Sequence, residues 1–182
     1  NIFPDGGIAR LRLFGNIDLS LQKISNKNTI DLASVINGSQ VVACSDEHFG
    51  NANNILLPGK SKNMGNGWET RRRRGLGYDW VLIKLGLGGY PTSFEINTHY
   101  FKGNYPDCFS VQAIDHKKNI SINSIITNSK KWKTIIAKTK LKPDSSLKIK
   151  MLKKFYKKYN YIKLNIYPDG GISRFRVFGK II

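Results

Sequence analysis

Apolar and polar residues alternate in several short stretches of the chain, and this pattern predicts β-strands. Residues 8–14 alternate so that two arginines share one face, and residues 172–178 repeat the arrangement. Further strands are predicted at residues 40–45, 80–85, 93–98, 109–115 and 160–166, with one or two more within 124–137. Short strands at close spacing with Gly/Pro turns are typical of an antiparallel all-β sandwich or jelly roll.

The stretches between these strands predict turns, loops and one short helix. The run Gly86-Leu87-Gly88-Gly89-Tyr90-Pro91 predicts a hairpin turn, and residues 49–67 predict a loop that residues 54–57 anchor by apolar contacts. Residues 31–38 predict a short helix with Asp31 as its N-cap and Gly38 at its end. Residues 148–159 show no clean amphipathic stripe, which leaves their structure open.

One stretch occurs twice, 164 residues apart. Residues 1–15 are NIFPDGGIARLRLFG and residues 165–179 are NIYPDGGISRFRVFG, with 11 of 15 positions identical. In each copy the Pro-Asp-Gly-Gly sequence predicts a turn that leads into the strand with two arginines. The spacing is the size of a domain. We therefore interpret residues 1–15 as the final strand of a first, mostly absent repeat domain, 16–30 as a linker and 31–182 as a second domain. A terminal strand pair within one domain is the alternative.

The chain is strongly basic, with a formal net charge of +18. Fifteen of its 30 basic residues are lysines between Lys117 and Lys163, where Asp144 is the only acid. A lysine bias of this kind favours a solvated face over a dedicated binding surface, although non-specific attraction to polyanions follows from the charge. No helix-turn-helix pattern or RNA-binding aromatic motif supports a nucleic-acid binder.

The chemistry of single residues excludes several classes of site. Cys44 and Cys108 lack CxxC spacing, and His48, His99 and His116 lack the spacing of a metal motif. We therefore expect no metal and no cofactor. Two isolated thiols, no membrane-length apolar run and no visible signal peptide predict a soluble cytoplasmic protein without a membrane partner.

Three polar clusters follow or precede predicted strands: SDEH at residues 45–48, GWETRRRR at 67–74 and HYFKGNYP at 99–106. Loops at the end of a rigid sandwich gather into sites. Four arginines beside Trp68 suggest capture of an anion, because a guanidinium pairs with a carboxylate or phosphate through two hydrogen bonds. The competing interpretation, that an arginine lies in solvent or pairs with Glu69 or Asp79, is favoured for Arg73 and Arg74. It stays open for Arg71 and Arg72.

Carboxylates in these clusters are candidate general acids or bases. Glu69, Asp46 and Glu47 could each protonate a leaving nitrogen or activate water. An isolated carboxylate is more often a surface charge, so position alone selects none of them.

The clusters together resemble the allantoicase family. The matching segments are VVACSDEHFG, the stretch from NNILLPGK through GWETRRRRGLGYDWVLIKLG, FEINTHYFKGNYPDCFSVQA, LKPDSS and both PDGGI copies. They touch nearly the whole chain except the lysine-rich part between residues 117 and 163. The resemblance implies the C-terminal half of a protein of two similar jelly-roll, galactose-binding-like domains. It implies a hydrolase that converts allantoate to ureidoglycolate and urea in allantoin catabolism, a branch of purine metabolism.

The resemblance and the substrate's chemistry together suggest site residues. Allantoate has one carboxylate and two ureido arms, so we expect Arg71 and Arg72 to bind the carboxylate and Asn104 to bond a ureido group. Glu69 and Glu47 are the candidate catalytic residues. Trp68 and His99 are further candidate substrate contacts. Allantoate is the expected partner, and we expect a homo-oligomer.

Two positions depart from the family pattern. Asn66 and Asn97 stand where the family usually has aspartate, and the histidine near Asn97 is displaced by one place. An amide carries no charge and cannot act as a base. The alternative function is therefore a catalytically degenerate jelly-roll module that binds a small ligand. If those acids only cap turns, asparagine substitutes for them readily.

Overall fold

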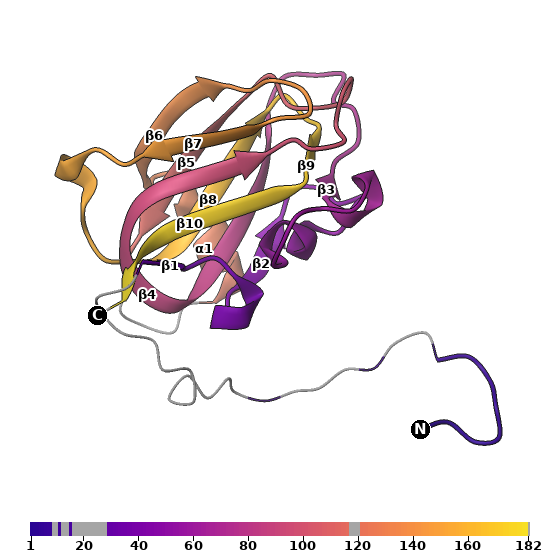
Figure 1. Ribbon diagram of the computed structural model, residues 1–182. Coiled ribbons are helices and arrows are strands. Elements are labelled where there is room, and N and C mark those ends of the chain that lie inside the picture. Colours follow the sequence, from indigo (N-terminus) through magenta and orange to yellow (C-terminus); the bar gives the residue numbers. More distant parts are fainter. Residues whose placement is uncertain (9–10, 12–14, 16–28, 117–120, 182) are drawn as a thin grey trace.

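One long strand organises the computed structural model, which describes residues 1–8, 11, 15, 29–116 and 121–181 (Figure 1). This strand, β4 (Asp79–Asn97), is 19 residues long. Its first half pairs with β2 (Gln40–Cys44) and β8 (Tyr159–Tyr167), and its second half pairs with β7 (Ser146–Lys150) and β10 (Arg174–Ile181). All four pairings are antiparallel. Because β4 pairs with strands of both layers, it connects the two layers of the sandwich. The predicted antiparallel β-sandwich is confirmed.

The remaining strands extend the layers. On one side β8 pairs with β5 (Cys108–Ile114), which pairs with β6 (Lys133–Lys140). On the other side β10 pairs with the short β1 (Ile30–Asp31). A separate two-stranded sheet joins β3 (Trp68–Glu69) to β9 (Gly171–Ile172). The main core contains inward-facing residues from both layers, among them Ile83, Phe94, Phe109, Ile162, Leu164, Phe175 and Val177.

The hairpin predicted at residues 86–91 is wrong, because β4 runs through them without a turn. The glycines serve close backbone approach instead. A Cβ on Gly86 would lie 2.0 Å from the carbonyl oxygen of Asn37, and one on Gly89 would lie 2.5 Å from that of Lys180. The strand needs glycine at these positions because neighbouring backbone occupies the space that a side chain would fill. In the sequence, glycines of this kind cannot be distinguished from the glycines of a turn.

The segment 124–137, predicted to contain one or two strands, contains one, and its first half is helical. α1 (Ile122–Ser129) begins at Ser121, whose side chain accepts a hydrogen bond from the backbone N–H of Ser124, and β6 follows it. A serine that caps a helix end stabilises the helix locally against the strand preference of the isoleucines. Residues 148–159 contain the end of β7 and the 3₁₀ turn η4 (Lys153–Phe155).

The helix predicted at residues 31–38 is shorter than expected. Only η1 (Val35–Asn37) is helical, its N-cap is Ser34, and Asp31 belongs to β1. Gly38 ends the turn with a φ of 81°, as predicted. The loop predicted at 49–67 is confirmed with two short 3₁₀ turns, η2 (Ala52–Leu56) and η3 (Met64–Asn66). Its apolar anchor is confirmed as well, since Ile55 and Leu56 are fully buried.

The two copies of the repeated stretch differ in what the structure describes. In the second copy β9 and β10 follow the turn Pro168–Gly171, hereafter the PDGG turn, with Gly170 at a φ of 131°. In the first copy residues 1–8 are exposed and contain no strand. Most of the strand predicted at 8–14 and of the linker at 16–30 lies outside the described residues. The division into two repeat domains therefore stays a prediction.

Candidate functional site

A cavity of about 440 Å³ lies where the predicted clusters at 67–74 and 99–106 meet the PDGG turn. It is lined by Phe49, Glu69, Thr70, Arg72, Arg73, Gly103, Asn104, Tyr105, Asp107, Pro168, Asp169 and Gly170. We call it the Glu69 cavity. Its residues come from four segments of the chain that the strand pairings bring to one end of the sandwich, which is where sandwich folds place their sites.

Glu69 and Asn104 are brought together in this cavity, as the sequence suggested. The side-chain Nδ2 of Asn104 donates a hydrogen bond to Oε1 of Glu69. Their backbones are held by the same glycine: Glu69 pairs with Gly171 across the β3–β9 ladder, and the N–H of Gly171 donates to the Asn104 carbonyl at 2.8 Å. Oε2 of Glu69 and Oδ1 of Asn104 have no protein partner within the described residues, so both are available to a ligand.

Arg71 lies outside the cavity and is held by Asp46. Its backbone N–H donates to Oδ2 of Asp46 at 2.7 Å and its Nε donates to Oδ1 at 3.1 Å. Partial burial opposes ionisation of Asp46, but these hydrogen bonds outweigh it and hold the pKa of the carboxyl below its ordinary value. Arg71 therefore pins its loop, and the structure does not place it as a carboxylate clamp.

Arg73 is also paired, which is one of the two alternatives predicted for it. Its guanidinium Nη2 donates to Oδ1 of the buried Asp79, and its backbone N–H donates to Oδ2 of Asp169 at 2.8 Å. Arg74 is exposed and outside the cavity. Arg72 and Arg73 both line the cavity, and of these two only Arg72 has no hydrogen-bond or ion-pair partner in the part of the chain that the structure describes. It is the arginine left for an anionic ligand.

Two further candidates lie away from the cavity. Trp68 is fully buried, and its Nε1 donates to the carbonyl of Asp46 at 2.8 Å, so its ring contributes to the core and does not line the Glu69 cavity. Oε2 of Glu47 accepts the backbone N–H of Ala52 at 2.9 Å, at the start of η2. Glu47 therefore stabilises a turn and does not line the Glu69 cavity.

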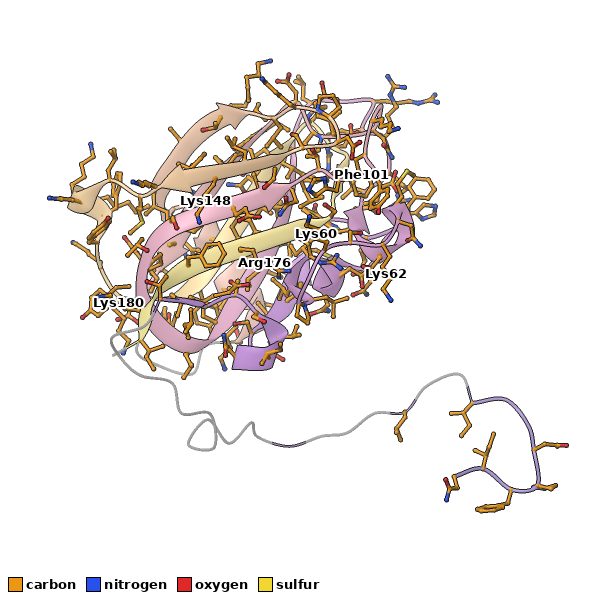
Figure 2. All side chains as sticks on the ribbon, in the orientation of Figure 1. Lys60, Lys62, Phe101, Lys148, Arg176 and Lys180 are labelled. Atoms are coloured by element: carbon orange, nitrogen blue, oxygen red, sulfur yellow. The ribbon has the colours of Figure 1, made fainter. Side chains whose placement is uncertain are left out.

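His99 lies at a second, smaller hollow of about 220 Å³ on the outer face of β10, β4 and β7. This hollow is also lined by Lys60, Asn97 and Arg176, and Figure 2 shows Lys60 and Arg176 close together on that face. Nδ1 of His99 is 3.8 Å from Oδ1 of Asp144. The structure thus separates His99 from Glu69 and Asn104.

The two departures from the family pattern also lie outside the Glu69 cavity. Oδ1 of Asn66 accepts a hydrogen bond of 2.5 Å from Nη2 of Arg174, which is buried. Nδ2 of Asn97 donates to Oε1 of Glu95 at 3.0 Å. Burial lowers the pKa of the Arg174 guanidinium. The amides at 66 and 97 therefore satisfy structural partners, and neither faces Glu69 or Arg72.

Several cavity residues were not among the sequence candidates. Phe49, Thr70 and Asp107 gave no signal, because single residues of these types are common in loops. Asp169 had a signal of its own, since it belongs to the repeated PDGG motif, but it was interpreted only as a turn residue. Within the described residues no three His, Cys, Asp or Glu side chains gather as a metal site would require. No described helix has the length and apolarity needed to cross a membrane.

The Glu69 cavity combines three chemical functions. It holds a carboxylate oxygen and a guanidinium that have no partner among the residues described here, and an amide oxygen that can accept a hydrogen bond. Such a set can bind a small anion that also carries N–H donors, and the carboxylate can transfer a proton to or from it.

Comparison with known sequences places most of the chain in one family. Residues 30–182 match the family model described as "Allantoicase repeat". A protein named "Probable allantoicase" from Photobacterium profundum is 43% identical over 185 residues, which cover 98% of this chain and 54% of the relative. One of the same name from Pseudomonas syringae pv. tomato is 42% identical over 181 residues, covering 100% of this chain and 54% of the relative. The chain thus spans about half the length of these relatives.

Comparison with solved structures agrees. The crystal structure of allantoicase from Saccharomyces cerevisiae superposes with a TM-score of 0.72 and 33% identity, covering 86% of this chain and 45% of that chain. A fucolectin from striped bass serum superposes with a TM-score of 0.60 at 13% identity, over 84% of this chain and 48% of that chain. At that identity the likeness shows the sandwich fold alone.

Proposed function

The chain belongs to the allantoicase family, and on that premise we propose that it takes part in the hydrolysis of allantoate to ureidoglycolate and urea, with the Glu69 cavity as the substrate site. One observation carries the proposal: Glu69, Asn104 and the unpaired Arg72 line the same cavity. The volume of about 440 Å³ falls within the range of small-molecule sites.

The reaction defines what the site must supply. Allantoate carries one carboxylate and two ureido arms on a single carbon. Hydrolysis breaks the bond between that carbon and one ureido nitrogen. The hydroxyl of water goes to the carbon, and the proton of water ends on the departing urea nitrogen. The site therefore needs a cation for the carboxylate, an acceptor for ureido N–H groups and a group that moves a proton.

The cavity residues match these three needs. Arg72 binds the carboxylate through its planar fork of N–H groups. Asn104 holds Glu69 with its Nδ2, and its free Oδ1 accepts an N–H from a ureido arm. Glu69 uses Oε2, the oxygen that Asn104 does not bind, to take the proton from water and return it to the leaving nitrogen.

A urea-release assay on allantoate tests the proposal. It compares this chain with a longer chain that restores the upstream repeat of the relatives, each with wild-type Glu69 and with Glu69→Gln. Loss of an acid–base group lowers the rate by about 10²–10⁴-fold, so we expect that loss in Glu69→Gln. Glu47→Gln is the matched control, because Glu47 is a carboxylate of the same type outside the cavity, and its rate should stay near wild type.

The outcomes separate the candidate functions. Urea release that survives in Glu69→Gln removes Glu69 from the mechanism. Calorimetric binding of allantoate without urea release from either length of chain supports the degenerate binding module instead. The homo-oligomeric state and the cytoplasmic location expected from the sequence remain predictions.

A further inference from the structure

The PDGG turn contacts both walls of the Glu69 cavity. On one wall, the N–H of Thr70 donates to the Gly170 carbonyl at 3.3 Å, and the N–H of Gly170 donates to the Thr70 hydroxyl at 3.1 Å. On the other, the N–H of Gly171 donates to the Asn104 carbonyl at 2.8 Å. The turn therefore sets the distance between the loop that carries Glu69 and the loop that carries Asn104.

The same turn holds the arginine run. Oδ2 of Asp169 accepts the backbone N–H of Arg73 at 2.8 Å, and the Arg73 guanidinium pairs with Asp79. Arg73 is thus fixed through both its backbone and its side chain: Nη2 of its guanidinium pairs with Asp79, while its buried Nε has no partner within the described residues.

Arg72 lies between two anchored neighbours. On one side, Asp46 binds the backbone N–H and the guanidinium of Arg71. On the other side, Asp169 binds the backbone N–H of Arg73 and Asp79 binds its guanidinium. A residue held on both sides has few backbone conformations, and in the one observed Arg72 lines the cavity. If the anchor on one side is lost, the chain can rotate and carry Arg72 away from the cavity.

We propose that Asp169 is a positioning residue for the Glu69 cavity: by accepting the Arg73 N–H it keeps Arg73 turned to Asp79 and Arg72 turned to the cavity. The inference rests on the proposed function for its ligand, allantoate, but not for the geometry it assigns to the loop. Asp169 acts through Arg73 and Arg72, so what matters is an acceptor oxygen at this place and not a negative charge.

Two substitutions separate these roles. Asp169→Asn keeps a side-chain oxygen that accepts the Arg73 N–H but removes the charge, whereas Asp169→Ala removes both. We expect the Arg73 amide to exchange with solvent at least about tenfold faster in Asp169→Ala and at nearly the wild-type rate in Asp169→Asn. We expect the Kd for allantoate, measured by calorimetry on the full chain, to rise about tenfold in Asp169→Ala and less than about threefold in Asp169→Asn.

Asp144→Ala is the matched control for a general loss of stability. Oδ1 of Asp144 accepts the backbone N–H of Tyr100 at 2.8 Å, so this variant loses the same kind of hydrogen bond from a loop outside the Glu69 cavity. Its melting temperature should fall at least as much as that of Asp169→Ala, because Asp144 also has a φ of 44°, which alanine adopts less readily than aspartate, while its Kd for allantoate stays at the wild-type value.

The exchange and binding results decide different claims. An Arg73 amide that exchanges at the wild-type rate in Asp169→Ala overturns the inference, whatever the ligand does. If Asp169→Ala does not fold, Asp169→Asn decides, since loss of Arg73 protection or of affinity in that variant also overturns it. If the wild-type chain does not bind allantoate but the exchange pattern holds, the proposed function fails and the positioning role stands.

Discussion

The four consecutive arginines show how much of a residue's role depends on its partners. Arg71 is held by Asp46, Arg73 by Asp79 and Asp169, and Arg74 is exposed, so Arg72 is left to face the cavity. The sequence predicted an anion site here, and it predicted that Arg73 would lie in solvent or pair with an acid. It could not separate Arg71 from Arg72, because Asp46 lies 25 residues away in sequence and nothing in the pattern links the two.

Asn66 provides a residue-scale prediction about stability. The buried Arg174 has neutral acceptors, among them Oδ1 and the carbonyl of Asn66. Asn66→Asp supplies a charged acceptor in the same place, and the added attraction between the carboxylate and the guanidinium contributes on the order of 1 kcal/mol. We expect the free energy of unfolding, from urea denaturation at pH 7, to rise by about that amount.

The pH dependence of this gain is its internal control. An aspartate paired with Arg174 has a folded-state pKa below its unfolded value of about 3.9, so its contribution is present above that pH. The contribution disappears as the pH falls through the folded-state pKa. A gain that persists after the carboxyl is protonated, or a loss of stability at pH 7, would contradict the pairing.

At the scale of elements, glycines were the least predictable residues. The strands predicted at 40–45, 109–115 and 160–166 are confirmed as β2, β5 and β8, and β5 and β8 are buried along most of their length. The glycines of β4 led to the wrong prediction of a hairpin. Gly86 is needed because it closely approaches the Asn37 carbonyl, and Asn37 is too far away in sequence for the local pattern to reveal this contact. Helix α1 was not predicted, because its isoleucines favour a strand. The hydrogen bond that Ser121 accepts at the N-terminus of the helix favours the helix instead.

Gly171 makes a second, element-scale prediction. A Cβ at this position would lie 2.0 Å from the ring of Phe101, which is fully buried, and the same glycine joins the two walls of the Glu69 cavity. Gly171→Ala should lower the free energy of unfolding by about 1–3 kcal/mol, the scale of overpacking in a filled core. Chemical denaturation measures this loss.

Gly103→Ala is the comparison variant for Gly171→Ala. A Cβ on Gly103 would meet nothing within 4 Å, although Gly103 lines the same cavity. Its stability should change by less than about 0.5 kcal/mol. Equal losses in the two variants would show that the ring of Phe101 does not constrain the PDGG turn.

At the scale of the whole molecule, the described sandwich begins at β1. Ile30 packs against the core, Leu32 is fully buried, and Oδ1 of Asp31 accepts the backbone N–H of Val177 at 3.0 Å. Deleting residues 1–28 should therefore leave the domain folded, with a change in unfolding free energy of under about 0.5 kcal/mol. This deletion tests the division into two repeat domains, because a first copy that belongs to this sandwich would be needed for its stability.

A longer deletion calibrates the measurement. Removing residues 1–33 takes away β1 and Leu32, and loss of one buried leucine alone lowers stability by about 2–5 kcal/mol. Thermal and urea unfolding of both truncated chains should therefore differ clearly. If the shorter deletion unfolds the domain as well, the interpretation of the repeat as two domains is wrong.

The most direct test of the account is calorimetric titration of allantoate into the chain and into its Arg72→Ala and Arg74→Ala variants. Both side chains are exposed, but of the two only Arg72 lines the cavity. Loss of a charged hydrogen bond to the substrate should weaken binding by about 2–3 kcal/mol in Arg72→Ala, whereas Arg74→Ala, outside the cavity, should change it by less than about 0.5 kcal/mol. Equal affinities in the two variants would show that the arginine run is only a basic surface and that the Glu69 cavity is not where the substrate carboxylate binds.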